Sequence, residues 1–250
     1  MANTGRRTGK RRRGAAVYAP VAVLLTLFII IFGVSVFFRV ENIEVTGTGR
    51  YTADEVIAAS GIERGDNLFF IDSDAAARRI RGAMPYVSMV RIARRAPDTA
   101  VIEITESRAV AAVADGGSYW KIDAAGRVLE RTDFGGTAGL IRVSGFSPSS
   151  PKEGAVIEAD ESYETQKGFL LDVLSAADVK GITEDVSNLD VTNISAITFI
   201  YKGSVSVNLG GGDNALFKLD KLISVLEEQE SGFRGRVDVS KDGKISVIPE

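Results

Sequence analysis

The longest apolar stretch of this chain lies at residues 15–38, where 24 consecutive residues carry no charge. At a helical rise of about 1.5 Å per residue the stretch reaches roughly 36 Å, more than the roughly 30 Å of hydrocarbon in a bilayer. Residues 1–14 carry six basic groups and no acidic group. The positive-inside rule therefore predicts one transmembrane helix, with 1–14 in the cytoplasm and 39–250 outside the cell membrane.

Two other interpretations of this end are open. A cleaved signal peptide also begins with basic residues, and Gly33-Val34-Ser35 resembles a cleavage site, but signal peptides have apolar regions of only about 7–15 residues. The basic residues at 10–13 could instead contact nucleic acid. Their position beside an apolar stretch is explained by topology alone, so we expect no nucleic-acid partner.

Residues 39–107 carry the alternation and capping signals of a small α+β domain. Thr52-Ala53-Asp54-Glu55 matches a capping box, which predicts a helix that begins there and ends at Gly61. The expected elements are a strand at 39–46, a helix between Thr52 and Gly61, a helix from Asp72 or Ser73 to Arg81, and strands at 87–95 and 100–106. Their order is strand, helix, helix, strand, strand.

Residues 108–250 predict a larger, mixed and β-rich domain. The expected elements are a hairpin at 119–123 and 127–130, a short strand at 140–143, a helix around 169–177, strands at 196–201 and 204–209, a helix at 216–226, and a final hairpin at 235–240 and 245–248. The whole chain is therefore expected to be of the α+β class.

Composition excludes several functions. The chain has no cysteine and no histidine, so it cannot form disulfides, thiolate zinc sites or any catalytic centre that needs an imidazole base. The net charge of −3 is uneven, because the basic residues of 1–14 precede an acidic body. We expect no cofactor and no bound metal.

A glycine-rich segment, Gly210-Gly211-Gly212-Asp213-Asn214-Ala215, fits the dinucleotide-binding pattern G-x-G-x-x-A, and Asp238 lies where a ribose-binding acid would be sought. Three facts argue against a nucleotide. Too few residues follow for a parallel sheet, Asp213 would repel a pyrophosphate, and an exported domain has no obvious dinucleotide supply. A strand-to-helix turn is the expected role.

Other candidate chemistry is weak. The carboxylate pairs Glu103/Glu106 and Asp160/Glu161 could suggest glycoside hydrolysis, but such spacings arise readily among 33 acidic residues. We therefore expect no enzyme. Trp120 could stack on a sugar, although a half-buried anchor in a strand is the expected role. Arg91, Arg94 and Arg95 form a candidate basic patch for an acidic partner or a cell-wall polymer.

The last predicted strand has no later element to cover it, which makes its edge a candidate for accepting a partner strand by β-augmentation. Its flanking lysines would attract an acidic partner. A proline at Ser246 is expected to remove one edge donor and to leave the fold intact. The candidate partner-binding residues are Arg236, Ser240, Lys241, Lys244, Ile245, Ser246, Val247 and Ile248.

The ordered set of motifs after the apolar stretch resembles the FtsQ/DivIB family of bacterial division proteins. The motifs are FRVENIEVTG at 38–47, GDNLF at 65–69, PYV at 85–87, RRAPDT at 94–99, IEITESR at 102–108, IDAAG at 122–126, VNLG at 207–210, the segment 218–222, and GRVDVS at 235–240. No long tail precedes the apolar stretch or follows the last strand, which distinguishes this sequence from many relatives.

The resemblance implies a basic tail at 1–14, a transmembrane helix at 15–38, a POTRA domain at 39–107 and an FtsQ-type β-domain at 108–250. It also implies a scaffold at the division septum that joins FtsL-like and FtsB/DivIC-like bitopic partners and helps control septal peptidoglycan synthesis. The FtsB-like partner is expected to add to the last strands of the β-domain. A membrane-anchored protein that binds an envelope polymer is the alternative.

Overall fold

The structure, a computed structural model, describes residues 15–230, 232–241 and 244–250, so the predicted cytoplasmic tail lies outside it. The elements are α1 (Ala15–Phe37), β1 (Asn42–Thr46), α2 (Ala53–Ser60), α3 (Ser73–Ala83), β2 (Val87–Arg95), β3 (Thr99–Glu106), β4 (Ala111–Asp115), β5 (Ser118–Ile122), β6 (Val128–Thr132), η1 (Gly135–Thr137), β7 (Ile141–Ser144), η2 (Glu161–Tyr163), α4 (Glu164–Val179), β8 (Val186–Asp190), β9 (Ile197–Tyr201), β10 (Val205–Gly210), α5 (Ala215–Glu227), β11 (Gly235–Lys241) and β12 (Lys244–Pro249). The chain forms two compact units: residues up to Arg79 with Val90–Ile104, and Ile80–Met89 with Thr105–Glu250.

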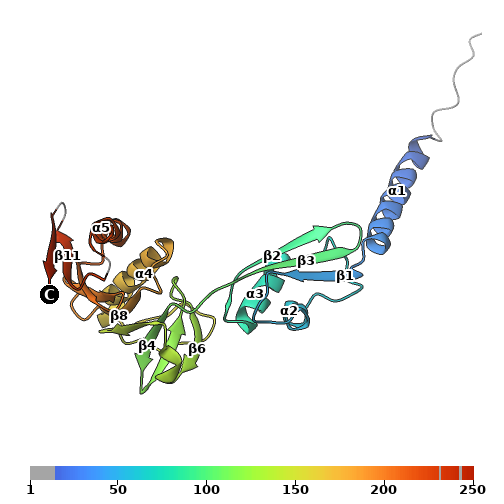
Figure 1. The fold of residues 1–250 in the computed structure, drawn as a ribbon. Coiled ribbons are helices and arrows are strands. Elements are labelled where there is room, and N and C mark those ends of the chain that lie inside the picture. The colour runs from blue at the N-terminus through green and yellow to red at the C-terminus, as the bar shows by residue number, and fades with distance from the viewer. Residues whose placement is uncertain (1–14, 231, 242–243) are drawn as a thin grey trace, which may run out of the picture. The chain divides into compact units, whose positions relative to one another are not determined.

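The first sheet has three strands in the order β1-β3-β2, and β1 runs parallel to β3 with Asn42 opposite Thr99. The predicted order of one strand, two helices and two strands is confirmed (Figure 1). Thr52 and Glu55 form the expected capping box, and Gly61 ends α2 in a left-handed conformation. The Asp72 carboxylate accepts a hydrogen bond from the Ala75 amide at 2.9 Å and so caps α3.

A helix occupies most of the apolar stretch. α1 covers Ala15–Phe37, and its large described side chains, including Leu24 and Phe32, are exposed. Within residues 15–230, 232–241 and 244–250, no helix meets the combined length and hydropathy required of a membrane span. The helix is therefore confirmed, and the membrane span predicted at 15–38 is not.

The second sheet has nine strands in the order β12-β11-β10-β9-β8-β7-β4-β5-β6. Helices α4 and α5 contact each other and share one core with the inward-facing side chains of the strands. Its largest fully buried side chains include Ile122, Ile141, Ile157, Leu170, Leu174, Leu189, Ile197 and Phe199. This core joins all nine strands into one layer covered by two helices.

Two strands of this sheet, β4 and β8, were not predicted from the sequence. Strand β4 has the sequence AAVAD with three fully buried residues, so it lacks the polar–apolar alternation that marks a half-buried strand. Strand β8, VSNLD, buries only Val186 and Leu189. Neither pattern is distinguishable from a loop without knowledge of the neighbouring strands.

One expectation about topology is wrong. We expected too few residues after the glycine-rich segment for a parallel sheet. In the structure β10 and β11 are parallel, with Val207 opposite Val237, and α5 connects them. A single added strand suffices because β10 already belongs to a sheet through β9. The connection β10-α5-β11 is thus a strand-helix-strand crossover between parallel strands, as is β7-α4-β8 in the same sheet.

Candidate partner-binding site

Strand β12 ends the described order of the nine-stranded sheet and pairs with β11 alone (Figure 1). The two strands are antiparallel, with Arg236 opposite Ile248, Val237 opposite Val247 and Asp238 opposite Ser246. One side of β12 is therefore bonded to β11 and the other faces away from the sheet. This outer edge coincides with most of the partner-binding residues expected from the sequence.

The direction of each backbone group on β12 follows from one hydrogen bond. The Glu250 amide donates to the Arg234 carbonyl at 3.2 Å, which makes this pair a hydrogen-bonded one. Bonded and non-bonded pairs alternate along an antiparallel ladder. Ser246 and Ile248 therefore point their N–H and C=O groups toward β11, and Ile245 and Val247 point theirs outward.

This alternation corrects the expectation for Ser246. Its N–H lies on the inner side, opposite Asp238, so a proline there would break the β11–β12 ladder and leave the outer edge unchanged. Val247 is opposite Val237 in a non-bonded pair, and its N–H is an outer donor. Pro249, which has no N–H, is also in a non-bonded pair with Gly235, so β11 loses nothing.

The side chains of β12 alternate between two faces. Ile245 and Val247 pack against the core of the second sheet, whereas Ser246 and Ile248 are exposed on the opposite face. Arg236, opposite Ile248, is exposed on that same face. The exposed face beside this edge therefore carries the apolar side chain of Ile248 and the cationic side chain of Arg236. Lys241 adds a second exposed cation at the end of β11.

Two adjacent bulges fix the end of this edge. In β10 the Gly210 amide donates to Asn208 Oδ1, and in β11 the Ser240 amide donates to Asp238 Oδ1, each at 2.9 Å. Asn208 Nδ2 then donates to Asp238 Oδ2 at 3.0 Å and joins the two bulges. Both ladders change register at these points, so the paired side chains set where β11 turns away from regular pairing.

The same contacts perturb the acidity of Asp238. Its partial burial would raise the pKa of the carboxyl group, but hydrogen bonds from Ser240 and Asn208 and the nearby charge of Lys241 lower the pKa below its usual value. The carboxylate is thus the form that holds the two bulges together. The glycine-rich pattern suggested only a ribose-binding role for Asp238. The sequence signal for its structural role is the N-x-G spacing at the end of β10 and the D-x-S spacing at the end of β11.

The glycine-rich segment is explained by packing. A Cβ on Gly212 would collide with the ring of Phe169, and a Cβ on Gly210 would lie 2.7 Å from the Ser240 Cβ. The Lys218 side chain is buried beneath the segment, and its Nζ donates to the Gly211 carbonyl at 2.9 Å. These contacts give each of the first and third glycines a structural role at the β10–α5 connection, as a strand-to-helix turn requires.

The candidate basic patch is engaged within its own domain. Arg94 donates to the carbonyls of Leu68 and Ile71 at 2.8 Å, and Arg95 forms an ion pair with Glu44 at 2.8 Å. Arg91 lies 3.7 Å from Glu103. The three arginines thus have intradomain partners that position β2 against β1, β3 and the segment after α2.

The remaining candidates have ordinary positions on strands or next to a short helix. Glu103 is exposed on β3, and Asp160 precedes the short helix η2. Trp120 is half-buried against the core, its Nε1 donates to Asp115 Oδ2 at 3.0 Å, and the Arg131 guanidinium lies 5.7 Å from its ring, which confirms an anchoring role in β5. In the described part of the chain, no group of three acidic side chains is positioned to hold a metal ion.

Comparison with known proteins identifies both domains. The FtsQ-type POTRA domain matches residues 38–107, and the C-terminal domain of cell division protein FtsQ/DivIB matches residues 111–240. The chain is 26% identical to cell division protein DivIB of Clostridium botulinum strain Hall over 94% of this chain and 91% of the relative. It is 26% identical to cell division protein FtsQ of Streptomyces venezuelae over 94% of this chain and 86% of the relative, and 32% identical to FtsQ of Corynebacterium glutamicum over 65% and 75%. With two matched domains in the expected order, the chain belongs to the FtsQ/DivIB family of cell division proteins.

Proposed function

We propose that this protein is a membrane-anchored scaffold of the division machinery that links FtsL-like and FtsB/DivIC-like bitopic partners at the septum and helps control septal peptidoglycan synthesis. The family assignment supports a role in division. The observation that carries the proposal is the one-sided pairing of β12 at the end of the nine-stranded sheet. A scaffold acts by binding other proteins, and the outward backbone groups of β12 can pair with a strand of a partner.

The edge suits β-augmentation by an extended segment of a partner. Ile245 and Val247 supply outward donors and acceptors at alternate positions, which match the spacing of a new strand. A partner strand would satisfy these groups with hydrogen bonds that each contribute about 0.5–1.5 kcal/mol net. Exposed Arg236 and Lys241 favour a partner that carries acidic residues beside its strand.

Helix α1 serves as the anchor in this proposal. Its 23 residues reach about 34 Å at the helical rise, and its exposed apolar side chains require an apolar environment. The N-terminal basic residues then remain cytoplasmic and the two domains lie outside. Protease added to cells stripped of wall should digest the domains, and protection of the domains would overturn this topology.

Site-specific photo-crosslinking tests the partner edge. Ile248 and Val156 belong to the same unit and are almost equally exposed, at 56% and 55%, so Val156 is a matched control. A photoreactive residue at Ile248 in dividing cells should crosslink to a small bitopic protein of the FtsB/DivIC type, and one at Val156 should not. Equal crosslinking from both positions, or none from Ile248, would contradict the assignment.

The polymer-binding alternative has less support. It requires a basic groove lined by aromatic residues, and the candidate arginines Arg91, Arg94 and Arg95 are engaged with Glu103, with backbone carbonyls and with Glu44. The β12 edge, in contrast, offers directional backbone groups that a polysaccharide would not match.

A further inference from the structure

The segment between α2 and α3 is fastened to the end of α1. The Leu68 amide donates to the Phe38 carbonyl, the Val40 amide donates to the Asp66 carbonyl, and the Gly65 amide donates to the Val40 carbonyl, all at 2.8 Å. Through these bonds, residues 65–68 pair with residues 38–40, which directly follow α1. The first domain is thus joined to α1 by hydrogen bonds as well as by the chain itself.

A side chain adds a direct bond to the helix. Asn67 Nδ2 donates to the Val34 carbonyl at 3.0 Å, which satisfies one of the last carbonyl groups of α1. The Oδ1 atom of the same residue accepts from the Phe69 amide at 3.0 Å. Asn67 therefore fixes the backbone of the segment that follows it relative to the helix end.

Aromatic residues gather at this junction. The rings of Phe37 and Phe38 lie 5.2 Å apart between centroids, and those of Phe38 and Phe69 lie 4.8 Å apart, both pairs edge to face. Phe69 is 49% exposed and Phe70 is 78% exposed. We call Phe37, Phe38, Phe69 and Phe70 the aromatic collar.

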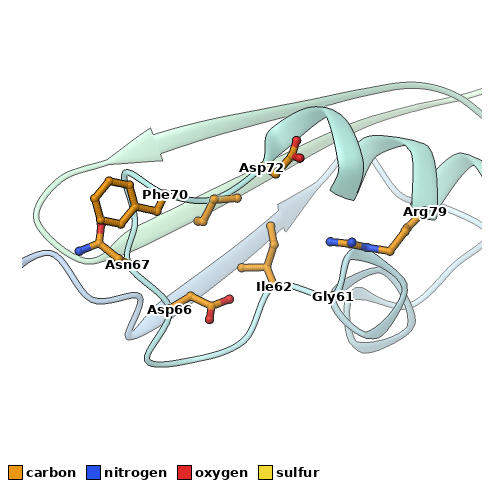
Figure 2. A pocket seen from close by; sticks show the side chains of 8 residues that line it. Gly61, Ile62, Asp66, Asn67, Phe70, Asp72 and Arg79 are labelled. Carbon is orange, nitrogen blue, oxygen red and sulfur yellow. The ribbon is translucent and has the colours of Figure 1, made fainter. Parts of the chain in front are cut away.

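Phe70 is exposed on a segment whose backbone is held in place by hydrogen bonds. Its amide donates to the Asn67 carbonyl at 3.0 Å, and Arg94 holds the carbonyls of Leu68 and Ile71 on either side. Figure 2 shows Phe70 and Asn67 together at one end of a small hollow, with Arg79 at the other end. The ring is thus presented outward from a braced segment, and two successive exposed phenylalanines cost solvation free energy unless another surface covers them.

The chemistry and position of the collar point to lipid as the covering surface. It directly continues the exposed apolar side chains of α1, which are proposed above to lie in the bilayer. Arg39, which follows Phe38, is exposed and can reach phosphate groups while the rings rest in the same headgroup region.

We infer that Phe69 and Phe70 rest in the headgroup region of the bilayer and that the aromatic collar fixes the first domain close to the membrane surface. This inference rests on the proposed anchoring by α1 and adds a second, peripheral contact with lipid. It assigns a role to the segment 65–70 that requires neither catalysis nor a protein ligand. Its consequence is a restricted range of orientations for the first domain.

Tryptophan fluorescence in vesicles tests the inference, because the chain contains a single tryptophan. Trp120→Phe provides a background in which Phe70→Trp, Met89→Trp and Leu27→Trp are compared in the full-length protein. Met89 lies on β2, within residues 38–107 that match the POTRA domain, and is 64% exposed, so it is a control of comparable exposure, and Leu27 reports on α1. Circular dichroism of each variant verifies that the fold is retained.

The full-length variants are reconstituted into vesicles of phosphatidylcholine and phosphatidylglycerol, with part of the phosphatidylcholine brominated high on its acyl chains for the two exposed positions and near the chain ends for Leu27→Trp. The tryptophan of Phe70→Trp should be quenched about twofold or more and emit at shorter wavelength, as expected for a ring at the bilayer interface. That of Met89→Trp should remain unquenched. Quenching in Leu27→Trp without quenching in Phe70→Trp overturns the collar and leaves the anchor intact. Absence of quenching in Leu27→Trp overturns the anchor and the collar together, and equal quenching at Met89 and Phe70 refutes a contact confined to the collar.

Discussion

Replacing Val247 with proline should separate partner binding from folding. Val247 lies opposite Val237 in a non-bonded pair, so its N–H points away from β11 and the inner ladder loses no hydrogen bond. The proline ring would occupy the place where a partner carbonyl approaches. The substitution therefore removes one donor from the outer edge and adds a steric obstacle there.

The expected loss of affinity follows from the unsatisfied carbonyl of the partner. Leaving a buried acceptor without a donor costs about 1–3 kcal/mol, which corresponds to about a 5- to 150-fold rise in the dissociation constant. The side chain of Val247 is half-buried against the core, so its truncation costs about 1 kcal/mol of folding free energy. Val247→Ala, which keeps the N–H, measures this side-chain contribution separately.

The assay is co-purification and titration of the full-length protein in detergent with the FtsB/DivIC-like partner. Val247→Pro should bind more weakly than Val247→Ala, while both unfold at similar denaturant concentrations. Ser246→Pro removes an inner donor and should lower the free energy of unfolding by about 1–3 kcal/mol. If Val247→Pro is folded and binds the partner as tightly as Val247→Ala, the outer edge of β12 is not the binding site.

Four further predictions concern the bulges, the glycine turn, the cationic end of the edge and the acidic residues. Asp238→Asn should lower the free energy of unfolding by about 1–2 kcal/mol, because its amide group would face the Asn208 amide. Since folding lowers the pKa of Asp238, its contribution is present at neutral pH and is lost as the pH falls from about 4 through the folded-state value, so denaturation curves of wild type and variant should converge in acid. Gly212→Ala should cost about 1–3 kcal/mol by collision with Phe169, whereas Gly168→Ala on α4, where a Cβ meets open space, should be neutral or stabilising in the same denaturation assay. Lys241→Glu should slow association with an acidic partner and reduce its salt dependence in stopped-flow measurements; an unchanged rate would exclude steering by this residue. Glu103→Gln, Glu106→Gln, Asp160→Asn and Glu161→Gln should each support division in a complementation assay, and a folded, recruited variant that fails to divide would favour an enzyme.

At the candidate site, the sequence predicted the strand, but only the structure gives the direction of its individual backbone groups. The alternating residues 245–248 predicted a strand with an unpaired edge, and β12 lies at the end of the described sheet order. The pattern did not determine which N–H groups face β11, because this depends on the register with a strand on the other side of a turn.

The glycine segment illustrates the same division. Its composition predicted a strand-to-helix turn, and the structure has one between β10 and α5. That Gly212 must be glycine follows from Phe169, which is distant in the sequence and belongs to α4. The buried Lys218 beneath the turn was likewise invisible, since a lysine on a predicted helix is ordinarily assigned to the exposed face.

The sequence by itself determined the features that depend on residues within a few positions of one another. The capping box at Thr52, the glycine stop of α2 and most of the alternating strands arise from local hydrogen bonds and side-chain periodicity. Only the tertiary structure decided the buried strands β4 and β8, the parallel pairing of β10 with β11, the outward direction of the Val247 backbone groups and the attachment of 65–68 to the end of α1. The physical reason is that backbone groups are chemically alike at every position, so their partners are chosen by the packing of the whole domain, which no local pattern records.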